Sequence, residues 1–189
     1  MSDLRYRILP SPIGPILVVA AGLEDDLHAA GKPRQSRDTI ALLHPFDGPA
    51  AYAVERAARV LAGPIEPDES IASHAAEQLE EYFAGRRDTF DLALDWRGVR
   101  GFTRAALEAV CEIPYGETAS YGEVAVMAGT PRAARAVGTA CSVTPFSIVV
   151  PVHRVIRSDG SIGEYGGHPE VKRFLLDLEK QDADEVADV

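Results

Sequence analysis

A histidine and an arginine directly after an apolar run are the residues best placed for chemistry. The run Ile148-Val149-Val150 is β-branched and ends at Pro151, so it predicts a buried strand that stops there, because proline cannot donate to a ladder. His153 and Arg154 then fall at the strand end, where folds present functional groups. The alternative is a satisfied core histidine, the usual state of a lone histidine among apolar residues.

Three predicted helices upstream must position this pair. An amphipathic pattern predicts a helix over Phe102–Ile113, and a second short helix follows over Gly122–Ala128. We expect Thr130 to cap a third helix, with Pro131 at its first position and its body over Arg132–Cys141. Two helices joined by a short glycine-bearing turn are typical of a helix-turn-helix.

The third predicted helix combines small residues with two arginines. Arg132 and Arg135 are three positions apart and therefore share a face, and a buried helix would not carry unpaired guanidinium groups. Small residues would let such a helix lie close to the sugar-phosphate backbone of DNA. The alternative interpretation of the small residues is a tightly packed helix inside the protein. The small residues are Ala133, Ala134, Ala136, Gly138, Thr139 and Ala140.

The first half of the chain predicts a small α/β scaffold. Apolar residues alternate over residues 4–8, and a turn with Gly14 leads into the run 16–19, which predicts a hairpin. From residue 21 to 49 the pattern weakens, with a loop at 31–34. Helices are expected over 52–61 and 71–83, and a last strand over 90–94. We identify no chemistry in this half.

Charge and composition bound the possible partners. The net charge of −10 argues against a general nucleic-acid binder, but seven arginines against four glutamates between residues 96 and 157 leave a modest basic face. No apolar run approaches the roughly 20 residues that span a bilayer, and no signal pattern follows Met1, so we expect a cytoplasmic protein without membrane contact. Cys111 and Cys141 are too few for a disulfide framework or a zinc site.

Seven short pieces, in order and correctly spaced, make the chain resemble the alkylguanine-DNA alkyltransferases, which take an alkyl group from O6 of guanine onto a cysteine. The family signature is Pro-Cys-His-Arg-Val, and this chain has Val152 where the acceptor cysteine belongs. Valine has no nucleophilic atom, so alkyl transfer at this position is chemically excluded. The matching pieces are Ile113-Pro114-Tyr115-Gly116-Glu117, Ser120-Tyr121-Gly122, Ala133-Ala134-Arg135-Ala136-Val137-Gly138, Pro151 with His153-Arg154-Val155, Ser158-Asp159-Gly160, Tyr165-Gly166-Gly167, and Lys172 with Leu175-Leu176 and Glu179.

The resemblance implies an α/β fold with two domains. Residues 1–95 would form an N-terminal ribonuclease-H-like α/β domain that supports the second one. Residues 96–180 would form a mostly helical C-terminal winged helix-turn-helix domain for DNA binding. We expect the acidic segment 181–189 to be a disordered tail.

The resemblance also implies a role for each site residue. His153 would be the base and Glu179 its orienter, beside the missing acceptor at Val152. The third helix would enter the DNA minor groove, with Arg135 filling the space of an extruded guanine. We expect no cofactor or metal. The implied DNA-binding set is Arg132, Ala133, Ala134, Arg135, Ala136 and Gly138, and the implied base pocket is Tyr121, Thr144, Tyr165, Gly166 and Gly167.

Three functional hypotheses remain open. The first is an alkyltransferase-like protein that binds O6-alkylguanine in double-stranded DNA as a monomer, without transfer, and recruits excision-repair proteins. The second is an alkyltransferase whose acceptor cysteine has been replaced, with Cys141 as a remote candidate for a substitute acceptor. The third is a winged-helix regulatory or architectural protein that binds DNA without turning out a base.

Overall fold

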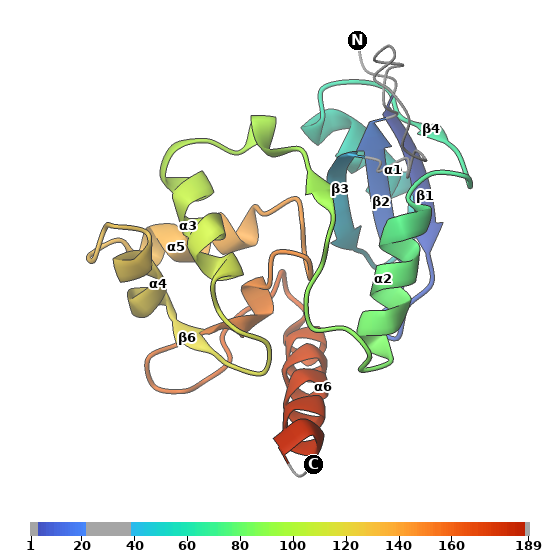
Figure 1. Cartoon of the computed structure of the whole chain (residues 1–189). Coiled ribbons are helices and arrows are strands. Elements are labelled where there is room, and N and C mark those ends of the chain that lie inside the picture. The colour runs from blue at the N-terminus through green and yellow to red at the C-terminus, as the bar shows by residue number, and fades with distance from the viewer. Residues whose placement is uncertain (1–3, 22–38, 188–189) are drawn as a thin grey trace, which may run out of the picture.

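The computed structural model describes residues 4–21 and 39–187. An N-terminal sheet with two helices lies beside a helical C-terminal region, and the last helix extends away from both (Figure 1). This arrangement confirms the predicted mixed α/β class. The proposed domain boundary near residue 95 stays a prediction, because one core cluster contains apolar side chains from both halves.

The sheet has five strands in the order β4-β1-β2-β3-β5. The predicted hairpin is confirmed: β1 and β2 are antiparallel, and Gly14 in their turn has a φ of +99°, a conformation that glycine adopts without strain. The two short edge strands pair in parallel with β1 and β3. The strands are β1 (Leu4–Leu9), β2 (Ile16–Ala21), β3 (Thr39–Pro45), β4 (Glu66–Pro67) and β5 (Ala93–Leu94).

Strand β3 is a feature that the sequence pattern did not predict. It lies in the region where the apolar periodicity weakens, yet its residues 40–43 are buried and pair with β2. A continuous apolar run is compatible with either a buried strand or a helix, so periodicity alone does not identify it. The loop predicted at residues 31–34 lies outside the described part of the chain.

The two sheet faces have different partners, as alternation along a strand requires. Helix α1 (Ala50–Val60) packs on the face of Leu17 and Val19. Helix α2 (Ser73–Phe83) and the C-terminal half share a core with the face of Ile16 and Val18. The sheet therefore has α1 on one face and α2 with the C-terminal half on the other.

The three predicted helices of the second half are confirmed and pack on one another. They are α3 (Gly101–Cys111), α4 (Tyr121–Met127) and α5 (Ala134–Ser142). Helix α4 begins with a capping box, in which the Ser120 hydroxyl accepts from the Glu123 amide and the Glu123 carboxylate accepts from the Ser120 amide.

The predicted start of the third helix is wrong by two residues. Ala133 occupies the cap position of α5, so Thr130 is not the cap and Pro131 is not its first residue. The Ala133 amide instead donates to the Thr130 carbonyl at 3.0 Å and closes a turn. Arg132 thus lies in the turn before the helix and does not share a helical face with Arg135.

The predicted strand over residues 148–150 is also wrong. Ile148 has a φ of +74°, which a β-branched residue adopts only under strain, and the Val150 amide donates to the Phe146 carbonyl at 2.8 Å. The run is a buried turn that leads into a 3₁₀ helix, η2 (Val152–Arg154). Only β7 (Val155–Ile156) is a strand there, parallel to β6 (Ala119–Ser120).

Helix α6 (Pro169–Ala187) closes the chain. It continues through residues 181–187, within the acidic segment for which the sequence predicts a disordered tail. A second 3₁₀ helix, η1 (Trp96–Gly98), joins the two halves. Within the described residues, none of the helices has the length and apolar character needed to cross a membrane.

Candidate functional site

Helix α5 presents its first turns to solvent. Arg135 is exposed, and within the described residues its side chain makes no hydrogen bond or ion pair. Arg132 is also exposed, but it lies in the preceding turn. An unpaired guanidinium group on a helix of small residues is free to contact a phosphate or stack on a base. The exposed start of this helix is compatible with the predicted DNA-binding set, which stays a prediction.

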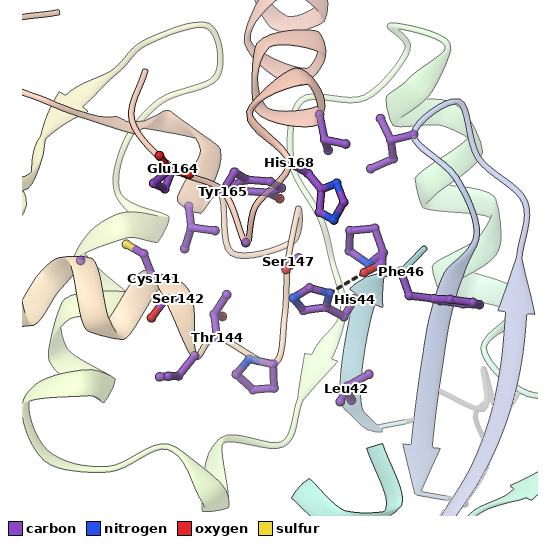
Figure 2. Close-up of a pocket in the computed structure, with 18 of the residues that line it drawn as sticks. Leu42, His44, Phe46, Cys141, Ser142, Thr144, Ser147, Glu164, Tyr165 and His168 are labelled. Carbon is purple, nitrogen blue, oxygen red and sulfur yellow. Dashed lines mark hydrogen bonds between the residues drawn. The ribbon is translucent and has the colours of Figure 1, made fainter. Parts of the chain in front are cut away.

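A cavity of about 1020 Å³ opens beside α5 and runs between the two halves of the molecule (Figure 2). Arg135 and Gly138 line it from α5, and Val152 lines it from η2. This volume lies at the upper end of the range for small-molecule sites, and a single nucleobase would fill only part of it. Of the implied base pocket, Tyr121, Thr144, Tyr165 and Gly166 line the cavity, whereas Gly167 does not.

Tyr121 forms a flat wall of this cavity. A side chain at Gly138 would contact the Tyr121 ring at 3.7 Å, and one at Gly163 would contact the Tyr121 hydroxyl at 3.5 Å. The Tyr121 ring therefore lies between α5 and the loop after β7, and glycine at positions 138 and 163 leaves the space that the ring occupies. Burial raises the pKa of Tyr121, so its hydroxyl stays protonated and can donate a hydrogen bond.

The loop after β7 closes the opposite wall. Gly166 and Gly167 have φ values of +59° and +91°, which explains the glycine pair, because other residues are strained there. Thr144 is buried, and its hydroxyl accepts from the Phe146 amide at 3.3 Å, which fixes the turn after α5. Thr144 thus contributes to the wall mainly by holding that turn.

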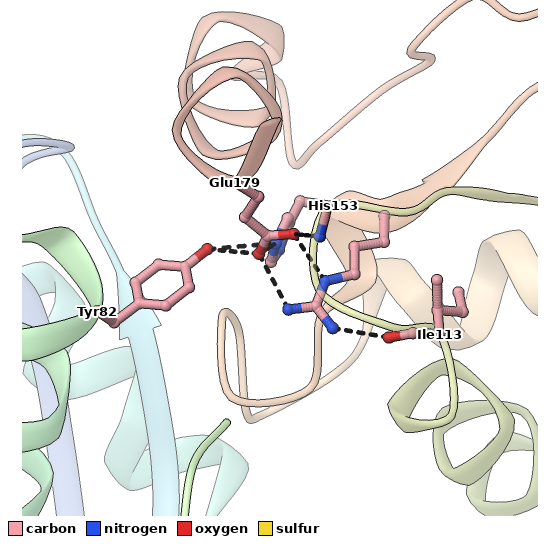
Figure 3. A network of polar contacts seen from close by, with 6 residues as sticks. Tyr82, Ile113, His153 and Glu179 are labelled. Atoms are coloured by element: carbon pink, nitrogen blue, oxygen red, sulfur yellow. Dashed lines mark hydrogen bonds and ion pairs between the residues drawn. The ribbon is translucent and has the colours of Figure 1, made fainter. Parts of the chain in front are cut away.

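A buried carboxylate, Glu179, makes five hydrogen-bond contacts (Figure 3). Arg154 binds Glu179 in a bidentate manner, Nε to Oε2 at 2.9 Å and Nη2 to Oε1 at 3.0 Å. The Tyr82 hydroxyl donates to Glu179 Oε1 at 2.7 Å, and His153 Nε2 lies 2.7 Å from the same oxygen. The Gly116 amide donates to Oε2 at 3.2 Å. Every side of the carboxylate is therefore occupied.

The charges of this network follow from its contacts. Burial alone would raise the pKa of Glu179, but the hydrogen bonds from His153 and Arg154 outweigh it and lower the pKa to about 2. Burial lowers the pKa of His153 and exceeds the opposing effect of Glu179. His153 is thus neutral at pH 7. Its Nε2 carries the proton, because Glu179 only accepts, and its Nδ1 is a free acceptor.

The predicted base and orienter are therefore in contact, but their setting differs from the prediction. His153 and Arg154 are buried at 0% and 6% exposure, not presented at an exposed strand end. His153 Nδ1 is buried and makes no hydrogen bond among the described residues. Val152 is 5% exposed and lines the cavity with a hydrocarbon side chain. His153 is therefore buried like a core residue, and its Nδ1 has no proton to accept from any neighbouring group in the described part of the chain.

Tyr82 is a site residue that the sequence did not reveal. It comes from α2, in the half interpreted as a scaffold without chemistry, and is 97 positions from Glu179. Its ring packs edge-on against Tyr115 at 6.2 Å, and the Arg154 guanidinium lies 5.6 Å from the Tyr115 ring centre. The sequence predicts only that Tyr82 lies in a helix, and no local pattern there indicates a contact with the site.

Cys141 lies in the cavity wall but is poorly suited as a substitute acceptor. Burial raises its pKa to about 12, although nearby Lys172 opposes the shift. Thiols react as thiolates, so this one is unreactive at neutral pH. Burial lowers the pKa of Lys172 to about 8, and its ammonium donates to the Val155 carbonyl at 2.6 Å. No cluster of three or more metal-ligating side chains occurs within the described residues.

Comparisons with known proteins agree with this fold and site. Residues 101–181, which contain α3 to most of α6, match the family described as "6-O-methylguanine DNA methyltransferase, DNA binding domain". The methylated-DNA–protein-cysteine methyltransferase of Methanosarcina barkeri is 40% identical over 179 residues, which cover 94% of this chain and 98% of the relative. The Mycobacterium tuberculosis protein of that name is 50% identical over 117 residues, 62% and 70% of the two chains.

Solved structures give the same result for the whole fold. The crystal structure of Mycobacterium tuberculosis O6-methylguanine methyltransferase superposes with a TM-score of 0.72 at 36% identity, covering 95% of this chain and 94% of the other. The same protein in complex with DNA gives 0.73 at 37% identity, with 94% of each chain covered. The fold and the site thus define an alkyltransferase scaffold. The chain belongs to the methylated-DNA–protein-cysteine methyltransferase family, with valine at position 152.

Proposed function

We propose that this protein binds O6-alkylguanine in double-stranded DNA by turning the base into the cavity, and that it leaves the alkyl group in place. The observation that carries the proposal is Val152 itself, which lines the cavity and directly precedes the buried His153 in the chain. An apolar side chain there can contact an alkyl group but cannot accept it. The protein is therefore proposed to act as a lesion-binding member of a repair family.

Three features support the binding step. Arg135 is exposed beside the cavity entrance, where it can fill the place of an extruded base. Tyr121 supplies a protonated hydroxyl and a flat ring inside the cavity. The cavity is large enough for a guanine with its substituent. The relative that superposes on this chain was crystallised in complex with DNA.

A second candidate is an alkyltransferase whose acceptor cysteine has been replaced. The retained contact of His153 with Glu179 favours it, because a base and its orienter have no chemical use without a thiol. Both candidates share the binding step and differ in the origin of Val152. Reading codon 152 in the genomic sequence decides between them.

The proposal is tested by titrating fluorescent duplexes that are identical except for one O6-methylguanine in place of guanine. We expect tighter binding of the modified duplex and no mass increase of the protein afterwards. Equal affinity for both duplexes would contradict base binding and favour a winged-helix protein that only binds the DNA backbone. Recruitment of excision-repair proteins is part of the proposal and calls for a separate pull-down with the modified duplex.

A further inference from the structure

One part of the cavity that Val152 lines has polar walls. His44, Ser147, Tyr165 and His168 all line it, and in Figure 2 they surround a common space, with Ser147 between Tyr165 and His44. We call these four residues the polar chamber. His44 comes from β3 in the first half, whereas the other three come from the second half. The chamber therefore exists only because the two halves pack together.

The chamber has hydrogen-bonding groups that the protein leaves unused. The Tyr165 hydroxyl is buried and, among the described residues, forms no hydrogen bond of standard geometry. Burial raises its pKa, an effect that the nearby Ser147 hydroxyl opposes only in part, so the group remains a donor. Ser147 is 2% exposed. An unpaired buried hydroxyl costs free energy, which a ligand with a matching group recovers.

His44 adds an acceptor to these donors. Its Nδ1 lies 2.6 Å from the Pro45 carbonyl, so Nδ1 carries the proton and Nε2 can accept. Burial lowers the pKa of His44, which keeps the ring neutral. His168 lies at the rim, with Nδ1 3.1 Å from Glu170 and Nε2 3.7 Å from Asp47. The chamber thus offers donors and an acceptor to a small neutral group.

We propose that the polar chamber selects O6 substituents that end in a hydroxyl group, such as 2-hydroxyethyl, over purely hydrocarbon substituents of equal size. The inference rests on the proposed function, because it requires the base to occupy the cavity. In the cysteine-bearing relatives, position 152 must meet the first carbon of the substituent. A substituent longer than methyl therefore needs further room in the cavity that Val152 and the chamber both line.

The contrast with a hydrocarbon substituent follows from desolvation. A propyl group has the same number of heavy atoms as hydroxyethyl but offers no hydrogen-bonding atom to the Tyr165 and Ser147 hydroxyls. Sites built to hydrogen-bond a substrate hydroxyl reject analogues that lack it. One hydrogen bond satisfied in place of one left open changes the dissociation constant by about tenfold.

The experiment uses the full chain and four duplexes that carry guanine, O6-methylguanine, O6-propylguanine or O6-(2-hydroxyethyl)guanine at one position. The readout is the ratio of dissociation constants for propyl and hydroxyethyl, measured within each variant by fluorescence titration. We expect a ratio of about ten for the parent. Ser147→Ala and Tyr165→Phe should each bring the ratio toward one. Ser142→Ala, whose hydroxyl donates to the Thr139 carbonyl at 2.8 Å, is the control and should keep it.

The outcomes separate this inference from the proposed function. Equal affinity for propyl and hydroxyethyl, with both bound more tightly than guanine, would overturn the chamber's role and leave lesion binding intact. A ratio of ten that survives in both variants would also overturn it, because the selectivity would come from elsewhere. Equal affinity for all four duplexes would contradict lesion binding itself, and the inference with it.

Discussion

The polar groups around Glu179 are buried and, apart from His153 Nδ1, paired, whereas those along the cavity wall face open space. Glu179 accepts hydrogen bonds from four residues and is 0% exposed. On the cavity side, Arg135 makes no hydrogen bond or ion pair among the described residues, and the Tyr165 hydroxyl has the Ser147 hydroxyl nearby but forms no hydrogen bond of standard geometry. A saturated network stabilises one arrangement of the fold, whereas unsatisfied groups retain free energy for a ligand. The valine separates a structural region from a binding region.

The strongest test of this separation is to restore a nucleophile at the boundary. Val152→Cys should change the protein from no transfer to measurable transfer, because the thiol would meet the free Nδ1 of His153 and lie beside the alkyl carbon. The measurement is intact-mass spectrometry after incubation with an O6-methylguanine duplex, where a single added methylene marks transfer. Val150→Cys, buried but outside the cavity wall, is the control and should remain unmodified.

Absence of the adduct on Val152→Cys, despite binding of the modified duplex, would show that the cavity has diverged beyond the missing thiol. Thr144, Ser147 and His168, which line the cavity, are then the next residues to substitute.

Removal of the carboxylate should have the largest effect on stability. Glu179→Ala leaves Arg154 and His153 buried without their partner, and breaking a buried pair in this way costs about 3–5 kcal/mol. Urea unfolding followed by circular dichroism measures the free energy of unfolding. Glu108→Ala, which breaks an ion pair with Arg104 on the surface of α3, should cost less than about 1 kcal/mol. Similar losses for both variants would contradict the buried network.

Arg135→Ala tests the binding side. Loss of the stacking contact should weaken binding of the O6-methylguanine duplex by about 1–3 kcal/mol and abolish the preference over guanine, while the free energy of unfolding is unchanged. Fluorescence titration of both duplexes measures the effect. Arg132→Ala is the control, since this arginine lies in the turn outside the cavity. Loss of the Arg132 side chain should weaken binding of both duplexes to the same extent. Undiminished preference in Arg135→Ala would remove this residue from the site.

The smallest predicted effect is a pH dependence of stability that originates in the network. The pKa of His153 is lower in the folded protein than its value near 6.5 in the unfolded chain, so the unfolded state binds more protons as the pH falls. The free energy of unfolding should therefore fall by about 1 kcal/mol between pH 7 and pH 5.5 through this group. Urea unfolding at both pH values, for the parent and for His153→Asn, measures it. An equal change in the free energy of unfolding with pH in the variant would contradict the assignment of this pH dependence to His153.

The sequence predicts the helices well and the site only in part, for a physical reason. Helices α3 and α4 follow from apolar spacing and from residues that end helices, which are local properties. The turn at Ile148 has no local signal, since β-branched residues favour strands and the positive φ is imposed by packing. The error there also explains why His153 and Arg154 were expected at an exposed position.

Contacts between distant segments account for the rest. The pairing of His153 with Glu179 could be inferred because the family motifs that this chain resembles include both residues. The hydrogen bond from Tyr82 to Glu179 and the position of His44 in the chamber depend on how the sheet packs against α6 and η2. Nothing in the spacing of these residues indicates that packing. The polar chamber therefore became visible only in the structure.

One competition experiment tests the central claim, binding without transfer, most directly. Limiting protein is mixed with equal amounts of the O6-methylguanine duplex and the unmodified duplex, and the DNA recovered from the bound fraction is digested and analysed by mass spectrometry. The account predicts a bound fraction enriched in O6-methylguanine, with the methyl group still on the base. Recovery of the two duplexes in their input ratio, or of guanine where the lesion was placed, would contradict it.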